Sequence, residues 1–329
     1  MIDRRRFATI AAGTLLALST ELRAQGKVTM RRIGYLSAFP RADIEAFLIL
    51  LRAELEMLGW TDGRNIALEV RTTEGRNELL PSAAAELVAQ APDLILVQSV
   101  PATRALMLAT KSIPIVMVFV GNPVELGIVA DYRKPGGNVT GSSYMANEYA
   151  GKLLQLLKEA APRLRSVAVF ANPSNEAAAP FSKQVRADAV ALGMQAQIVE
   201  VSGPGDFEAA FAAIRSANTR SILLPPEPLI LSKREAIAGF AQTHGLPLAV
   251  VGGRRSLPES GLIAFGPARG EYAQLAARYV DRILKGAKPG DLAVEQTTRF
   301  ELVINLGSAK ALGLTIPQAL LLRADEVIQ

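Results

Sequence analysis

The fold is decided by residues 32–59, RIGYLSAFPRADIEAFLILLRAELEMLG. Residues 32–37 form a short run that is typical of a strand. From residue 43 to 58, apolar side chains recur every three or four positions, which predicts a helix with one buried face. Gly59 follows at the place where a glycine commonly ends a helix. A strand joined directly to a covering helix is the building unit of a parallel α/β sheet.

The same pattern continues along the chain and then starts again. In the first half we expect strands at 66–71, 94–98 and 115–120, and helices at 82–90 and 102–110. In the second half we expect a strand at 167–171, helices at 176–192 and 233–244, and a capping Gly193. The spacing from Ile33 to Gly59 equals that from Val167 to Gly193. We interpret this as two lobes of the same design, with chance similarity of two βαβ units as the alternative.

Three segments predict where the chain crosses between the lobes. They are the turn-rich stretch at 135–141, PGGNVTG, and the extended segments at 261–266 and 295–304. The predicted fold class is therefore α/β, with two Rossmann-like lobes, parallel sheets and a three-stranded hinge. We expect the first lobe to hold residues 28–139 and 263–295, and the second to hold 140–262 and 296–329.

The N-terminus has the pattern of an export signal. Three arginines at positions 4–6 precede a short apolar stretch at 7–18, and Ala24 supplies a small residue for cleavage. We therefore expect residues 1–24 to be a removed signal peptide of twin-arginine type, with an ordinary secretory signal as the alternative. Because the chain has no cysteine, it has no site for a lipid anchor, and we expect a soluble periplasmic protein.

Composition argues against several other functions. The net charge is +5 with charged residues scattered and aromatic residues sparse, so we expect no nucleic-acid surface. No dinucleotide, phosphate-loop or nucleophile-elbow motif is present, and we expect no enzyme, metal or cofactor. The single histidine, His244, falls at a predicted helix end, where it favours the helix dipole.

Several motifs together resemble a known family. They are the leader at 4–7, PGGNVTG at 135–141, the glycine-bounded segment 261–266, and the C-terminal pattern from Phe300 to Ile328. In these the chain is similar to ABC-transporter substrate-binding proteins of the tryptophan/tyrosine-binding type, a branch of the type I periplasmic binding fold. The resemblance implies a monomer that closes on a small molecule and delivers it to a permease and an ATPase. An exported α/β enzyme, such as a racemase or hydrolase, and a sensor input protein remain as alternatives.

Loops at the carboxyl ends of the predicted strands supply the candidate ligand-binding residues, because ligands bind beyond these ends in open parallel sheets. The candidates are Ser37, Ala38, Phe39, Ser99, Pro101, Ala102, Asn122, Thr140, Asn172, Asn175, Glu227, Arg254 and Phe265. The resemblance implies that an acid at the position of Glu227 receives a ligand amine, but the prolines at 225, 226 and 228 depart from the family pattern. Helix-start amides near Ser99 suit a carboxylate. We expect an amino acid or a related carboxylate rather than a sugar.

Overall fold

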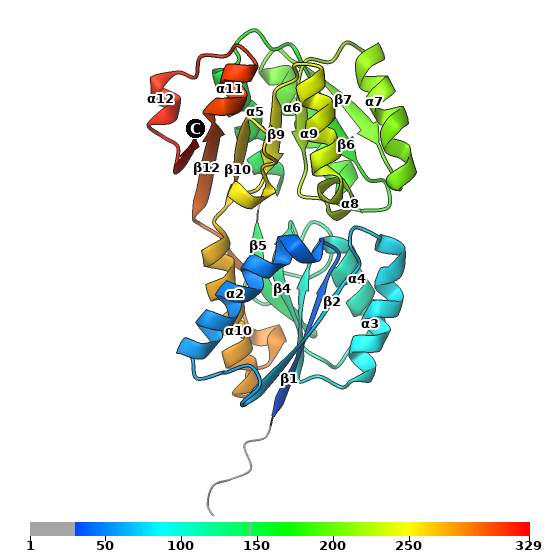
Figure 1. Ribbon diagram of the computed structural model, residues 1–329. Coiled ribbons are helices and arrows are strands. Elements are labelled where there is room, and N and C mark those ends of the chain that lie inside the picture. The colour runs from blue at the N-terminus through cyan, green and yellow to red at the C-terminus, as the bar shows by residue number, and fades with distance from the viewer. Residues whose placement is uncertain (1–29, 145) are drawn as a thin grey trace, which may run out of the picture.

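The computed structural model describes residues 30–144 and 146–329 and shows two α/β lobes, one above the other (Figure 1). Each lobe has a central sheet with helices on both faces, so the predicted fold class is confirmed. The predicted signal peptide at 1–24 lies outside the described residues. Across 30–144 and 146–329, no helix is long and apolar enough to cross a membrane.

The first lobe holds a sheet of strand order β11-β5-β4-β3-β1-β2 in which every pair is parallel. Its strands are β1 (Arg31–Ser37), β2 (Ile66–Thr72), β3 (Leu94–Gln98), β4 (Ile115–Gly121), β5 (Val139–Tyr144) and β11 (Glu295–Gln296). Its helices are α2 (Arg41–Met57), α3 (Leu80–Ala89), α4 (Val100–Ala109) and α10 (Arg269–Leu284). Helices α2 and α10 pack together on one face of this sheet, and α3 and α4 pack together on the other.

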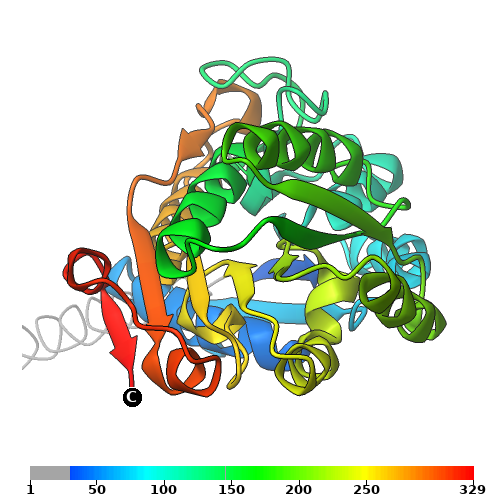
Figure 2. The ribbon, with the colours of Figure 1, turned by 90° about the horizontal axis from the view of Figure 1, so that it is seen from above.

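The second lobe holds a sheet of order β13-β12-β10-β9-β8-β6-β7, parallel except for the pair β10 and β12. Its strands are β6 (Ser166–Ala171), β7 (Gln195–Glu200), β8 (Ile222–Leu224), β9 (Leu248–Val251), β10 (Ile263–Pro267), β12 (Phe300–Asn305) and β13 (Glu326–Ile328). Its helices are α5 (Ala146–Ala160), α6 (Ala178–Ala191), α7 (Phe207–Ser216), α8 (Pro228–Ser232), α9 (Arg234–Thr243), α11 (Leu306–Ala311) and α12 (Gln318–Leu321). Figure 2 shows these helices around the sheet from above.

The cores explain why the strands read as nearly continuous apolar runs. Alternate side chains of a strand point to opposite faces, and both faces of these sheets are covered by helices. In β1, Ile33 and Tyr35 pack with the α2 and α10 side, whereas Leu36 packs with α3 and α4. Five members of the predicted apolar stripe of α2 are buried, whereas Leu58, just past the end of the helix, is 39% exposed. Gly59 follows at φ 87°. One apolar cluster continues from the α2 face of the first lobe to the α7 and α9 face of the second.

Three crossings join the lobes, and they fall slightly later than the sequence places them. The sequence puts lobe limits after residues 139 and 262, whereas backbone pairing keeps β5 in the first sheet and β10 in the second. The reason is that each strand stays hydrogen-bonded to its neighbour to its carboxyl end, as in the pair Gly121 and Tyr144. The third crossing lies at residues 297–299, between β11 and β12. The expected single extended segment at 295–304 is thus two strands in different sheets.

A substitution at Gly141 tests how closely β4 and β5 approach each other near the first crossing. It adopts φ +131°, and an added Cβ would lie 2.2 Å from the backbone oxygen of Met117. We expect Gly141→Ala to lower the free energy of unfolding by at least about 2 kcal/mol, because both the backbone angle and the contact are unfavourable. Urea denaturation measures this.

The matched control is Gly239→Ala in α9, where nothing lies within 4 Å of an added Cβ. There we expect a gain of roughly 0.5–1 kcal/mol, because alanine is the better helix former. Equal stability of Gly141→Ala and the wild type would contradict the close approach of the two strands.

Candidate functional site

A cleft between the two lobes is the candidate site. It holds about 730 Å³ of empty space, a volume that includes the solvent at its open mouth. Residues of both lobes line it, and most of them are apolar. They are Phe39, Ser99, Val100, Phe119, Gly121, Asn122, Leu126 and Tyr144 of the first lobe, and Phe170, Ala171, Asn172, Asn175, Ala177, Ala178, Pro180, Phe181, Ser182, Pro225, Pro226, Glu227 and Pro228 of the second.

The lining comes from the carboxyl ends of the strands. In the first lobe it follows β1, β3 and β4 and includes the last residue of β5. In the second lobe it follows β6 and β8 and continues into the start of α6. All of these strands are parallel to their neighbours within each lobe, so their carboxyl ends meet at one edge. The two edges face each other, which places helix starts and short loops on both sides of the cleft.

Aromatic rings give the cleft a continuous apolar wall. Phe119 stacks on Tyr144 with ring centroids 4.0 Å apart and planes 8° from parallel. The stack continues from Phe119 to Tyr272 at 5.1 Å in the first lobe, and from Tyr144 to Tyr149 at 5.7 Å in the second. Phe119 and Tyr144 border the cleft, whereas Tyr272 borders an adjoining hollow and Tyr149 is outside the cleft lining. The wall is therefore connected to the cores of both lobes near the first crossing.

Strained backbone concentrates in this lining. Among residues 30–144 and 146–329, six non-glycine residues have positive φ, and three of them border the cleft: Ser99 at 93°, Phe119 at 57° and Asn122 at 46°. A positive φ is a genuine outlier for a bulky residue such as phenylalanine. At Phe119 it coincides with a register shift between β4 and β5, a bulge that redirects the side chain. Such strain is typical of ligand clamps.

Glu227 is the most buried titratable group in the cleft wall. It is 4% exposed, and its Oε1 accepts a hydrogen bond of 2.9 Å from Asn172 Nδ2. Its Oε2 accepts a second bond of 2.9 Å from the backbone amide of Ile230, which caps the N-terminus of α8. Burial raises the pKa of the Glu227 carboxyl, and the hydrogen bonds from Ile230 and Asn172 oppose part of this rise.

The rest of the lining is uncharged. Among the described residues that border the cleft, Glu227 is the only Asp, Glu, Lys, Arg or His. Burial also raises the pKa of the Tyr144 hydroxyl, which therefore stays protonated near neutral pH. Asparagine amides and serine hydroxyls supply the remaining polar side-chain groups. Within 30–144 and 146–329, no group of His, Asp and Glu side chains is placed to hold a metal ion.

The structure brings together six of the predicted site residues, which are Phe39, Ser99, Asn122, Asn172, Asn175 and Glu227. Three others lie just behind them. Ser37 Oγ accepts a bond from the Phe39 amide, Ala38 is fully buried, and the Ala102 amide donates to Ser99 Oγ at 3.3 Å.

The other four predicted site residues lie away from the cleft lining. Pro101 borders a separate hollow beside α4. Thr140 is buried and donates to the Leu292 carbonyl at 2.6 Å. Arg254 pairs with Glu326 at 3.1 Å and borders a second hollow between the lobes, which shares Phe39, Phe119 and Pro226 with the cleft. Phe265 packs against Tyr149 and Phe300 near the crossings.

Four aromatic residues of the lining are missing from the sequence prediction, namely Phe119, Tyr144, Phe170 and Phe181. Phe119 reads as one more apolar residue inside a strand, because the bulge that turns it toward the cleft leaves no mark in the apolar pattern. Tyr144 is the last residue of β5, and this position at a strand's carboxyl end is the signal that could identify it. Phe181 lies on the inward face of α6, where the sequence predicts core.

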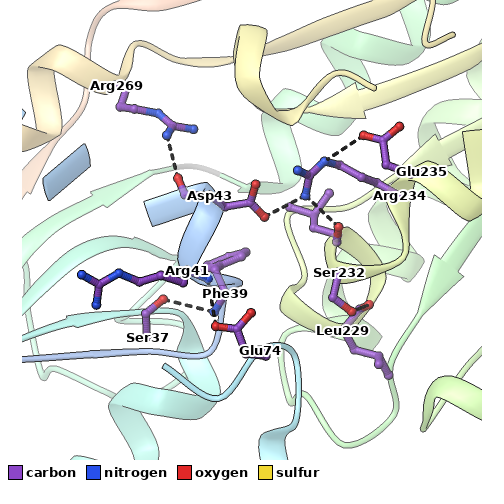
Figure 3. Close-up of polar contacts among 11 residues, drawn as sticks. Ser37, Phe39, Arg41, Asp43, Glu74, Leu229, Ser232, Arg234, Glu235 and Arg269 are labelled. Carbon is purple, nitrogen blue, oxygen red and sulfur yellow. Dashed lines mark hydrogen bonds and ion pairs between the residues drawn. The ribbon is translucent and has the colours of Figure 1, made fainter. Parts of the chain in front are cut away.

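Direct contacts join the lobes beside the cleft (Figure 3). Arg234 Nη1, at the start of α9, lies 2.7 Å from Asp43 Oδ2 in α2. Their side chains are only 20% and 17% exposed. Arg269, at the start of α10, donates to the Asp43 carbonyl at 2.8 Å and fixes this part of α2. On the opposite side, Arg104 of α4 pairs with Glu176 of the second lobe at 2.5 Å. The lobes therefore touch on both sides of the cleft, which is a closed arrangement.

Comparisons with known proteins agree with this architecture. Residues 51–328 match the family model of the ABC transporter substrate binding protein. A tyrosine-binding protein of Clostridioides difficile is 28% identical over 264 residues, covering 78% of this chain and 74% of the relative.

Two solved structures are similar over most of the chain. A Streptococcus pneumoniae ABC domain in complex with L-Trp has a TM-score of 0.84 at 24% identity, covering 91% of this chain and all 100% of that one. A conserved domain protein from Vibrio cholerae has a TM-score of 0.82 at 26% identity, with the same coverage of 91% and 100%.

The ion pair between Asp43 and Arg234 predicts how readily the lobes close. We expect Asp43→Asn to weaken the affinity for the tightest-binding compound of an amino-acid and carboxylate panel by roughly 3- to 10-fold, because a half-buried pair across the lobes loses its charge. Calorimetry gives the affinity. The control is Arg41→Gln, whose exposed pair with Glu45 stays within α2 and has no role in closure. Equal affinities of Asp43→Asn and Arg41→Gln would contradict a stabilising contact between the lobes.

Proposed function

Because the chain belongs to the ABC transporter substrate-binding proteins, we propose that it captures an amino acid or a related carboxylate in the interlobe cleft and hands it to a permease and its ATPase. The observation that carries this proposal is the cleft itself, an apolar site lined from both lobes at the carboxyl ends of their strands. A ligand in this position contacts both lobes at once. It therefore stabilises the closed form relative to the open one.

The shape and chemistry of the lining support the ligand class. Five aromatic side chains border the cleft and suit a planar, apolar body. Asparagine amides and the start of α4 at Ser99 suit a polar end such as a carboxylate. Two of the similar proteins are named for aromatic amino acids, one for tyrosine and one for its complex with L-Trp. A carboxylate-based racemase or hydrolase would need a second carboxylate beside Glu227, and the described lining supplies none.

We further propose that the protein is exported, acts as a monomer in the periplasm and loses residues 1–24 on the way. The arginines at 4–6 and the short apolar stretch after them support this route. Fractionation of cells, followed by N-terminal sequencing of the purified protein, is expected to give a periplasmic chain that begins near Gln25. A chain that keeps its first 24 residues and stays in the cytosol would contradict export.

Ligand binding is expected to close the lobes and to depend on the cleft amides. We expect calorimetry against amino acids, short carboxylic acids and sugars to select an amino acid or acid, and small-angle scattering to show a smaller radius in the complex. Asn175→Ala is expected to weaken that binding about tenfold, since one buried amide is lost. The control is Gln184→Ala on the outer face of α6, which removes an exposed amide. Tight binding of a neutral sugar, equal in both variants, would overturn the proposal.

A further inference from the structure

The carboxylate of Glu227 is already occupied by the protein. Its two oxygens accept bonds from the Asn172 side chain and from the Ile230 amide, both at 2.9 Å. Pro228 opens α8 immediately after it, so Glu227 stands at the N-cap, where an acidic side chain commonly satisfies free helix amides. Glu227 therefore has a complete structural role in the absence of any ligand.

Further groups crowd the same carboxylate. The Leu229 amide and the Asn77 side chain also interact with it and help to oppose the rise in its pKa. Asn77 belongs to the first lobe, and neither polar atom of its buried side chain has a well-aligned hydrogen-bond partner. A carboxylate has about four lone-pair directions for hydrogen bonds. Two protein groups thus hydrogen-bond Glu227 and two more lie near it when the lobes are closed, and an ammonium group of a ligand would have to compete with them.

The surrounding loop gives an ammonium group no substitute partner. Pro225, Pro226 and Pro228 flank Glu227, and no other acidic side chain borders the cleft itself in the described part of the chain. The two acids of the adjoining hollow, Asp43 and Glu301, already bond to Arg234 and to the Arg254 amide. An ion that enters a closed, apolar cleft needs a charged or fully hydrogen-bonded partner, because it loses its hydration. Burial favours the uncharged form of Glu227, which would weaken an ion pair still further.

From this geometry we infer that the cleft selects a carboxylate with a planar, apolar body and without an ammonium group. The inference rests on the proposed function and narrows its ligand class from amino acids to their deaminated counterparts. The carboxylate is received at the start of α4. There, Ser99 borders the cleft, and its hydroxyl already accepts a bond from Ala102, which leaves the hydroxyl proton for a ligand oxygen. On the other lobe, Asn175 uses its Oδ1 on the Ala177 amide, which leaves its NH₂ group as a donor.

The test compares three probes that share one body. Calorimetry on the full mature protein measures the affinities for L-phenylalanine, 3-phenylpropionate and 3-phenylpropanamide. The three corresponding compounds with the indole ring of tryptophan are measured in parallel. We expect the deaminated acid to bind at least tenfold more tightly than the amino acid. We expect the amide to bind more weakly than the acid, because it lacks the negative charge that the helix start favours.

Glu227→Gln separates a capping acid from an amine-binding acid. Glutamine keeps one acceptor for the helix start but cannot carry a charge. We expect the affinity ratio of acid to amino acid to change less than about threefold in this variant, whatever its effect on stability. An amine-binding Glu227 would instead shift the ratio by more than tenfold, since the amino acid alone would lose a charged partner.

The outcomes also separate this inference from the function on which it rests. Tighter binding of the amino acid than of the acid, lost in Glu227→Gln, would overturn the inference and leave a substrate-binding protein for amino acids. Tighter binding of the amide than of the acid would contradict the inferred recognition of a ligand carboxylate. Binding of a sugar, with none of the aromatic probes retained at millimolar concentration, would overturn both.

Discussion

The cleft depends on one constraint, which is that both faces of each sheet are covered by helices. Helices α2 and α10 lie against one face of the first sheet and α3 and α4 against the other, so no side chain of a central strand reaches solvent through a face. Ligand contacts are then left to the strand ends. Because the strands within each lobe are mostly parallel, loops and helix starts of the same kind collect at a single edge. Three crossings hold the two edges opposite each other.

The wall of the cleft is also part of the path between the lobes. The bulge in β4 gives Phe119 its positive φ and stacks it on Tyr144, the last residue of β5. Tyr144 in turn stacks on Tyr149, which lies in α5 of the second lobe. A ligand that packs on this wall therefore contacts side chains next to the first crossing. A ligand bound in the proposed cleft would therefore act directly on a segment that joins the lobes.

The sequence predicts the architecture well because the apolar periodicity of each segment indicates whether it forms a strand or a helix. The helix expected at 43–58 is found at Arg41–Met57, and the strand expected at 94–98 has those limits. The candidate site is predicted less completely, because its position depends on contacts between distant segments. Arg254 follows a strand end, yet it pairs with Glu326 of β13 and borders an adjoining hollow between the lobes, outside the cleft lining itself. Phe265 packs against the rings of Tyr149 and Phe300 and does not line the cleft.

Glu227 shows why the identity of a residue does not settle its role. An acid in a strand-end loop suggests an ion pair with a ligand, but α8 begins at the next residue and its amides require a cap. The Ile230 and Asn172 bonds meet that requirement, and they also keep the carboxylate hydrogen-bonded in the absence of a ligand. A binding protein must release its ligand when the lobes open. A cleft that holds its ligand through stacking and neutral donors, without a buried ion pair, lets water replace each contact at little cost during opening.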